Sequence, residues 1–167
     1  MKSLVNVKAL WRVVMFAILL PLSSVLIAQT SDPAAISRLM RQAKAHAALV
    51  EDEVFTLDGY SRSNISWLSY ALRLQEIKQH ANLLIADIRQ LKAMRGNATR
   101  PQREAIDRIA PLVQRMAVAF NTTIQALKRS QNAVNMPPFR EHVRTNRVLI
   151  EEIYTTISRS VNRNYET

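Results

Sequence analysis

Hydrophobic residues recur at every third or fourth position along the stretch from Asn64 to Arg95. Spacings of three and four alternate without a break, which places these residues on one side of a single α-helix. A helix of about 32 residues rises about 48 Å at 1.5 Å per residue, and so long an apolar stripe needs partner helices to shield it from water. The stripe consists of Trp67, Tyr70, Leu74, Ile77, Ala81, Leu84, Ile88 and Leu91. The opposite side carries Arg73, Gln75, Glu76, Lys78, Gln79, Asp87, Arg89 and Lys92.

The same pattern occurs three more times, so that four helices are expected, over residues 33–58, 63–95, 100–131 and 137–163. Each of the other stripes again places its apolar residues on one helix face. These stripes are Ile36, Met40, Ala43, Ala47, Val50, Val54 and Leu57; Ile106, Ile109, Val113, Met116, Phe120, Thr123 and Leu127; and Phe139, Val143, Asn146, Ile150, Ile153 and Ile157.

Capping residues indicate where these helices begin. Asp32 precedes Pro33, and a carboxylate cap followed by proline favours a helix start. Thr99 and Gln102 match a capping box at the start of the third helix. The pair Pro137-Pro138 predicts the start of the fourth, and Ser61 or Ser63 is expected to cap the second.

Glycine and proline indicate where helices end or bend. Gly59 and Gly96 are the only two glycines of the chain. Both follow a predicted helix, where glycine in the left-handed conformation commonly ends it. Pro111 lies inside the third helix and cannot donate a hydrogen bond to the carbonyl of Asp107. A kink is expected there rather than a new element, because the stripe continues in phase.

The short connections determine the expected fold. Connections of about 3 to 5 residues force neighbouring helices to run antiparallel. We therefore expect residues 29–167 to form one all-α domain, an antiparallel up-down-up-down four-helix bundle. Its coiled-coil-like spacing predicts crossing angles of about +20°.

The first 28 residues are typical of an export signal. Lys2, Lys8 and Arg12 form a basic start, and residues 13–28 form a 16-residue apolar run that ends at Ala28. A signal peptide cleaved after this run is the first interpretation, and an uncleaved inner-membrane anchor is the alternative. The run is shorter than the roughly 20 residues of a membrane span, which favours cleavage. Either interpretation places the bundle outside the cytoplasm, in the periplasm or secreted.

Composition and charge narrow the range of partners. The 167-residue chain has no cysteine, which rules out disulfides, iron–sulfur clusters and covalent haem. Its net charge is +10, and the chain without residues 1–28 keeps 20 basic and 13 acidic residues, a net charge of +7. This basic excess favours anionic surfaces such as lipid or polysaccharide. Nucleic acid is not an expected partner of an exported chain.

Three segments also resemble a known group of proteins. They are residues 62–67 (Arg-Ser-Asn-Ile-Ser-Trp), 74–80 (Leu-x-x-Ile-Lys-x-His) and 105–112 (Ala-Ile-Asp-Arg-Ile-x-Pro-Leu). This pattern resembles a family of uncharacterised exported all-helical proteins of acidobacterial type, over roughly residues 60–130. The resemblance implies export and an all-helical fold. No activity is assigned to that family, so the resemblance transfers no site residue.

Histidines and methionines are candidate ligands, because four-helix bundles often hold metals or haem. A di-iron site requires paired Glu-x-x-His motifs, whereas Glu76 and His80 are four apart and have no second copy. Counting residues outward from the connection between the first two helices places His46 level with Gln75 rather than with His80. Solvated or edge histidines are therefore expected, and neither a metal nor a cofactor. Catalytic residues are not expected either, because nucleophile and phosphate-loop motifs are lacking.

The remaining candidates concern packing and surface contact. Asn146 is a strongly polar residue at a core position, where it either fixes helix register as a buried amide or lies partly exposed at a wide seam. Trp67 and Tyr70 either line a pocket or fill a wide end of the core. An anionic surface is expected to contact Arg100, Arg103, Arg108, Arg159 and Arg163. Ion pairs are expected between Glu51, Asp52, Glu53 and Asp58 and the arginines 140, 144 and 147.

These features lead to two principal functional hypotheses. The first is a non-enzymatic interaction, scaffold or chaperone-like module of the cell envelope. The alternative is a carrier that binds haem or a small ligand within the bundle. A third hypothesis, the sensor part of an anchored receptor, is weaker. The sequence leaves the partner and the oligomeric state open.

Overall fold

The computed structural model describes residues 33–60, 63 and 65–163, without the side chains of residues 33 and 163. It contains four α-helices, α1 (Pro33–Tyr60), α2 (Trp67–Ala93), α3 (Arg100–Arg129) and α4 (Pro137–Arg163). Two 3-10 turns, η2 (Arg95–Asn97) and η3 (Gln131–Asn135), connect α2 to α3 and α3 to α4. The described residues contain no strand, so the predicted all-α class is confirmed. The predicted signal peptide, residues 1–28, lies outside the described residues.

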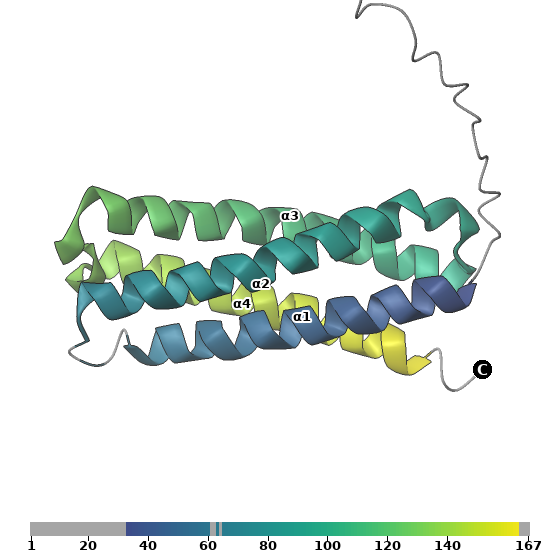
Figure 1. Cartoon of the computed structure of the whole chain (residues 1–167), viewed down its shortest axis with the longest axis horizontal. Helices are drawn as coiled ribbons and strands as arrows, with labels where there is room; N and C mark the ends of the chain where they lie inside the picture. Colours follow the sequence, from purple (N-terminus) through teal and green to yellow (C-terminus); the bar gives the residue numbers. More distant parts are fainter. Residues whose placement is uncertain (1–32, 61–62, 64, 164–167) are drawn as a thin grey trace, which may run out of the picture. The chain divides into compact units, whose positions relative to one another are not determined.

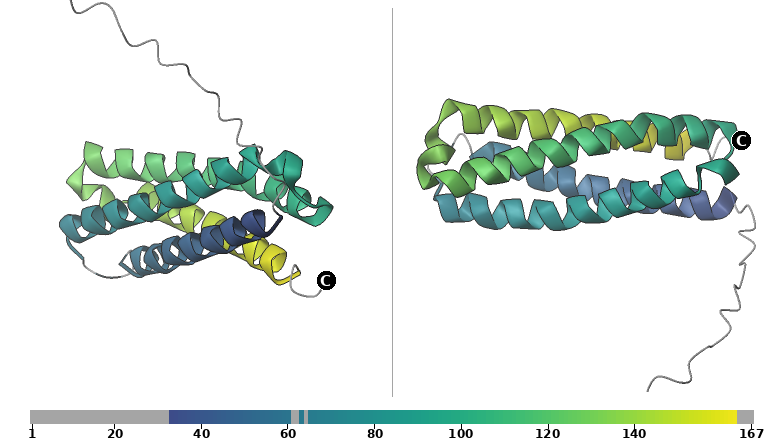
Figure 2. Two further views of the ribbon diagram at one scale, coloured as in Figure 1. Left: turned by 45° about the vertical axis from the view of Figure 1, so that its right-hand side comes forward. Right: turned by 90° about the horizontal axis from the view of Figure 1, so that it is seen from above.

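The four helices form an antiparallel bundle in which each helix packs against its neighbours in the chain. Contacts join α1 to α2 and α4, and join α3 to α2 and α4. Figures 1 and 2 show all four helices running along one long axis, with successive helices in opposite directions. The predicted up-down-up-down arrangement is therefore confirmed.

The second helix begins later than the sequence pattern predicts. Its N-cap is Ser66, whose hydroxyl accepts a hydrogen bond from the Ser69 amide at 3.3 Å. The Ser63 amide instead donates to the carbonyl of Tyr60 at 3.0 Å, which extends the turn after α1. The expectation that Ser63 caps α2 is wrong, and Ser61 lies outside the described residues.

Neither glycine ends a helix as predicted. Gly59 lies within the last turn of α1, which continues to Tyr60, and Gly96 lies within η2. Neither residue adopts the left-handed conformation. The end of α2 is instead closed by amides that turn back onto its last carbonyls, with Met94 N–H bonded to Gln90 O at 3.0 Å and Asn97 N–H to Met94 O at 2.9 Å.

The third helix begins and continues as predicted. Thr99 and Gln102 form the expected capping box, in which the Thr99 amide donates to Oε1 of Gln102 at 2.9 Å. The other end of the same side chain donates from Nε2 to the Ser37 hydroxyl of α1 at 3.1 Å. The helix continues through Pro111 without interruption. A single local motif thus both starts α3 and fixes it against α1.

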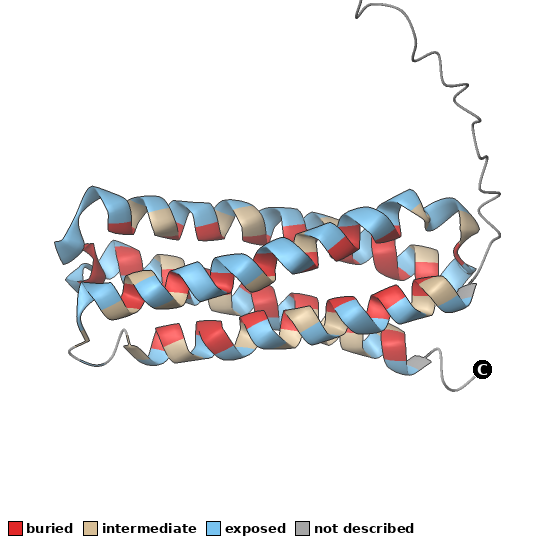
Figure 3. Cartoon of the chain, viewed as in Figure 1, coloured by how far each residue is buried: buried red, intermediate tan, exposed pale blue. Residues whose placement is uncertain are grey.

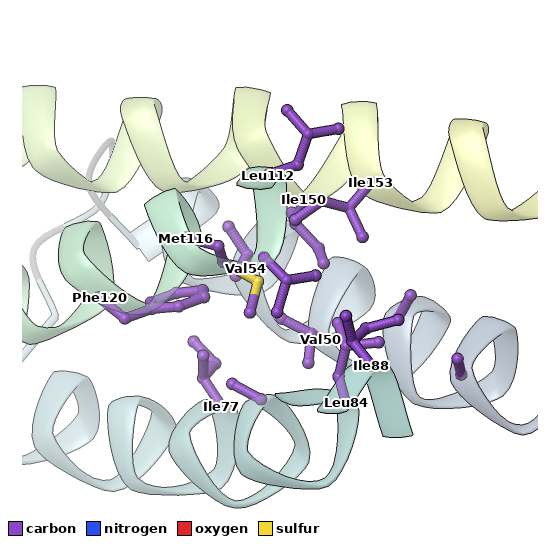
Figure 4. Packing of buried hydrophobic residues seen from close by; sticks show 14 of the residues in the cluster. Val50, Val54, Ile77, Leu84, Ile88, Leu112, Met116, Phe120, Ile150 and Ile153 are labelled. Atoms are coloured by element: carbon purple, nitrogen blue, oxygen red, sulfur yellow. The ribbon is translucent and has the colours of Figure 1, made fainter. Parts of the chain in front are cut away.

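The predicted stripes form the core. Buried positions on all four helices face the bundle axis, while the outer faces are exposed (Figure 3). Figure 4 shows Val54, Met116 and Ile150, from three helices, converging in the interior. Trp67 departs from the prediction, because 39% of its surface is exposed at the first turn of α2. Asp87 departs in the other direction, since it was assigned to the polar side and is buried.

Residues 36–161 supply every member of this core cluster. The packing that stabilises the bundle is therefore contained within residues 31–167, which form one compact unit of the chain. That segment can accordingly be produced and tested on its own.

Candidate functional site

Two adjoining cavities lie along the seam between α2 and α3. The larger has a volume of about 380 Å³ and is lined by residues 71–82 of α2 and 124–128 of α3. The smaller, about 200 Å³, is lined by residues 78–85 and 117–124. They share Lys78, Asn82 and Ile124, so together they form one continuous depression, which we call the α2–α3 groove. A volume of about 300 to 1,000 Å³ is usual for small-molecule sites.

Small side chains and an oblique helix explain why the groove forms. Ala71 and Ala81 on α2 and Ala117 on α3 line it, and alanine fills less of the space between two helices than the leucines and isoleucines elsewhere in the seams. Figure 1 shows α2 running obliquely to α3, with the two helices meeting at the η2 end. The cavities lie in the part of the seam away from that end.

The floor of the groove is apolar and its rim is polar. Leu74, Phe120 and Leu127 reach into the groove from the core, together with the partly buried Ile85 and Ile124. The rim consists of uncharged amides and two lysines, which are Gln75, Gln79, Asn82, Asn121, Lys78 and Lys128. No acidic residue lines either cavity, so the rim carries only positive charge.

A ladder of polar contacts occupies the other side of α2, in its seam with α1. The His46 Nδ1 atom lies 2.6 Å from Oδ2 of the buried Asp87, and Gln42 Nε2 donates to the other carboxylate oxygen at 2.8 Å. The second pair reverses the roles, with His80 of α2 bonded through Nδ1 to Glu53 of α1 at 2.9 Å. Both side chains are partly buried and bonded to carboxylates, so of the two alternatives the edge position is confirmed for His46 and His80.

The ladder follows the heptad geometry of two antiparallel helices. His46 and Glu53 are seven residues apart on α1, as are His80 and Asp87 on α2. The His46–Asp87 contact also corrects the predicted register, which placed His46 level with Gln75. The residue of α2 that meets His46 thus lies twelve positions, about three turns, beyond the predicted one, and the later start of α2 at Trp67 accounts for about one of those turns.

Burial perturbs the ionisation of the second pair. Glu53 is buried, and loss of hydration raises the pKa of its carboxyl group, although the neighbouring His80 opposes this shift. Its Oε2 atom has no hydrogen-bond partner among the described residues. Two turns further along the seam, the Tyr60 hydroxyl accepts a hydrogen bond from Arg73, which raises the pKa of that guanidinium group.

Asn146 forms a second buried polar contact, between α3 and α4. Its side chain is fully buried and donates from Nδ2 to Oγ1 of Thr123 at 2.8 Å. Thr123 in turn donates to the carbonyl of Ala119 at 3.1 Å. The Asn146 Oδ1 atom is buried and has no partner within the described part of the chain. The alternative of a partly exposed amide is therefore wrong.

The two candidate pocket aromatics lie away from the groove. Tyr70 is buried and makes edge-to-face contacts with Tyr60 and Phe139, with ring centroids 5.7 and 5.5 Å apart. Trp67 lies half-exposed at the start of α2. Neither lines the groove cavities, and Tyr70 instead fills the core where α1, α2 and α4 meet.

The arginines proposed for surface contact gather at one end of the bundle, where α1 and α3 begin and α2 and α4 end. Arg100 pairs with Glu104 at 3.1 Å, and Arg103 donates to the carbonyl of Ala98 at 2.7 Å. Arg108 and Arg159 are exposed. The side chain of Arg163 lies outside the described residues.

Ion pairing at the end of α1 is confirmed at one position. Arg147 donates to Asp58 Oδ2 at 2.9 Å and lies 4.2 Å from the ring centroid of Phe55. Glu53 pairs with His80 rather than with an arginine. In the described residues no group of three His, Cys, Asp or Glu side chains is arranged to hold a metal ion.

Fold and groove together define a four-helix-bundle protein with an apolar, cation-rimmed depression between two neighbouring helices. No protein-family model, no curated protein and no solved structure matches the chain. The resemblance to exported proteins of acidobacterial type therefore stays a prediction. None of the helices that the structure describes is both long enough and apolar enough to cross a membrane.

Sequence reasoning missed the groove and the ladder. The heptad spacing of His46 with Glu53 and of His80 with Asp87 was available in the sequence as a signal for the ladder. Ala71, Ala81 and Ala117 gave only a weak signal for the groove, since alanine is equally common in close helix packing.

Proposed function

We propose that this chain is an exported, non-enzymatic binding module of the cell envelope, which holds an apolar group of its ligand in the α2–α3 groove. The apolar floor of the groove is the observation that carries this proposal. Apolar surface in a concave site favours binding because a ligand that covers it removes that surface from water. The basic and apolar N-terminal residues support export.

Binding fits the groove better than catalysis does. General acid–base and nucleophilic mechanisms need a titratable group held next to a reacting atom. The groove lining contains no histidine, carboxylate, serine or threonine. His46 and His80 are bonded to carboxylates in the α1–α2 seam, on the other side of α2.

The carrier hypothesis gains support in its small-ligand form rather than in its haem form. Haem iron takes axial ligands such as histidine or methionine. The cavities are lined by neither residue type, whereas their amide rim and apolar floor suit an organic ligand with a polar end.

A second contact surface is proposed at the arginine-rich end of the bundle. Arg108 and Arg159 are exposed there, and Arg100 is largely exposed despite its pair with Glu104. An anionic lipid or polysaccharide surface would attract this end, and the attraction would weaken with salt.

The groove proposal can be tested with Nile red, a neutral dye that fluoresces strongly in apolar sites. We expect residues 31–167 to bind the dye saturably with one dominant site. Asn82 lines both cavities and is exposed, so Asn82→Trp should fill the groove without disturbing the core. Gln90→Trp is the matched control, at an exposed position of α2 outside the lining.

The two variants decide the question. Dye affinity should fall at least fivefold in Asn82→Trp, which is a loss of about 1 kcal/mol in binding free energy. In Gln90→Trp it should stay within twofold of the parent. Absence of saturable binding, or equal affinity in both variants, would show that the groove is not the site.

A further inference from the structure

The distribution of charge along the α2–α3 groove distinguishes its two ends. Lys128 lines only the larger cavity, while Lys78 lines both. The smaller cavity continues beyond Lys78 among Ala81, Ile85 and Ala117 and contains no further charge. The groove therefore changes from a cationic end to an apolar end.

Both lysines are available to an external anion. They are exposed, and among the residues that the structure describes no carboxylate pairs with either of them. The acidic residues nearest in the α2 sequence point elsewhere, since Glu76 pairs with Arg73 at 2.8 Å and Asp87 with His46. Two unpaired cations beside apolar surface favour a ligand with a negative head and an apolar body.

The dimensions of the groove favour a single chain over a helix. Along α2 the lining extends from Ala71 to Ile85, a distance of about 21 Å at 1.5 Å per residue. A carboxylate held between Lys78 and Lys128 leaves at least half of this length, toward Ile85, for the apolar tail. A helix is about 10 to 12 Å wide and could place only one face in cavities of about 380 and 200 Å³, whereas an extended chain can lie within them.

We propose that the α2–α3 groove binds a single-chain fatty carboxylate, with its carboxylate between Lys78 and Lys128 and its tail directed toward Ile85 and Ala117. The amides of Gln75 and Gln79 lie at the cationic end, where they can donate to the carboxylate oxygens. The assignment deepens the proposed binding function and rests on it.

The test is displacement of Nile red from residues 31–167 by hexadecanoate, with hexadecanol as a neutral probe of the same length, below micelle formation. We expect hexadecanoate to displace the dye about tenfold more strongly than hexadecanol, because two exposed ion pairs each add a modest contribution. The double variant Lys78→Gln/Lys128→Gln should abolish this preference, with each displacement measured against the variant's own affinity for Nile red. Lys44→Gln/Lys92→Gln removes the same charge outside the groove and should keep the preference.

The outcomes of this experiment distinguish the carboxylate assignment from the more general proposal that the groove binds an apolar ligand. If Nile red binds in the groove but hexadecanoate displaces it no better than hexadecanol, the carboxylate assignment is wrong and the binding function stands. If an acidic amphipathic peptide displaces the dye and hexadecanoate does not, the ligand is a helix and the assignment is again wrong. If the dye does not bind at all, both proposals fail.

Discussion

The buried contact between Asn146 and Thr123 makes a sharp prediction about stability. Its hydrogen bond contributes about 1 kcal/mol, whereas a buried carbonyl oxygen without a partner costs about 1 to 3 kcal/mol. Asn146 has one of each, since Nδ2 is bonded and Oδ1 is not. Leucine has nearly the same shape and removes both terms. We therefore expect Asn146→Leu to raise the free energy of unfolding by about 1 to 2 kcal/mol.

Thr123→Val probes the same contact from the other side. Valine preserves the shape of threonine but leaves the Asn146 amide without its acceptor, so unfolding should become easier by about 1 to 3 kcal/mol. In the Asn146→Leu background the same substitution should cost less than about 0.5 kcal/mol, because no amide remains to be satisfied. Thr122→Val is the control, since Thr122 is exposed and makes the same type of bond, to Val118 O at 3.0 Å.

Urea unfolding followed by far-ultraviolet circular dichroism measures the free energy of unfolding of the parent, the two single variants, the double variant and the control. The comparison requires that the slope of this free energy against urea concentration is the same in all of them. Light scattering should be recorded in parallel, because a buried amide can specify helix register and oligomeric state. The reasoning is refuted if Asn146→Leu is less stable than the parent and Thr123→Val costs the same in both backgrounds. That result would mean that the amide oxygen is satisfied and the two residues are not coupled.

Three further predictions address the ladder, the cap of α2 and the arginine-rich end. Burial raises the pKa of Glu53, so its contribution to folding is greatest at low pH and is lost as pH rises through the folded-state value. Unfolding titrations should therefore show the parent losing stability relative to Glu53→Gln from about pH 4 upward, and a constant difference would contradict this. Ser66→Ala should cost about 1 kcal/mol, and Ser63→Ala should cost much less if Ser66 is the cap. Co-sedimentation with anionic vesicles at low salt should decrease when three arginines of the arginine-rich end are replaced by glutamine. It should persist when three exposed arginines outside that end are replaced, and an equal decrease in both variants would refute binding through the arginine-rich end. The first set is Arg100, Arg108 and Arg159, and the control set is Arg115, Arg129 and Arg144.

Local patterns predicted the helices well because their causes are local. The apolar stripes and the capping box at Thr99 depend on residues three or four positions apart, and both are present in the fold. The predicted helix ends at the two glycines were wrong because a glycine near a helix end need not adopt the left-handed conformation. At Gly96 a 3-10 turn satisfies the last carbonyls of α2 instead.

Contacts between helices were harder to predict because they depend on register. Asp87 has the polarity of a surface residue, and only its partners on α1, Gln42 and His46, explain why it is buried. Once α2 starts at Trp67 instead of near Ser63, every partner across the α1–α2 seam changes. The groove depends further on the separation of α2 from α3, which the spacing of apolar residues does not specify.

The most direct test of binding in the α2–α3 groove is covalent mapping with a photoreactive hexadecanoate that carries a diazirine near its methyl end. After irradiation of residues 31–167 and tryptic digestion, we expect the label on peptides 79–89 of α2 and 116–128 of α3, which contain Ile85 and Ala117. Lys78→Gln/Lys128→Gln should reduce this labelling. Labelling spread over all four helices, or concentrated on α1 and α4, would contradict the account.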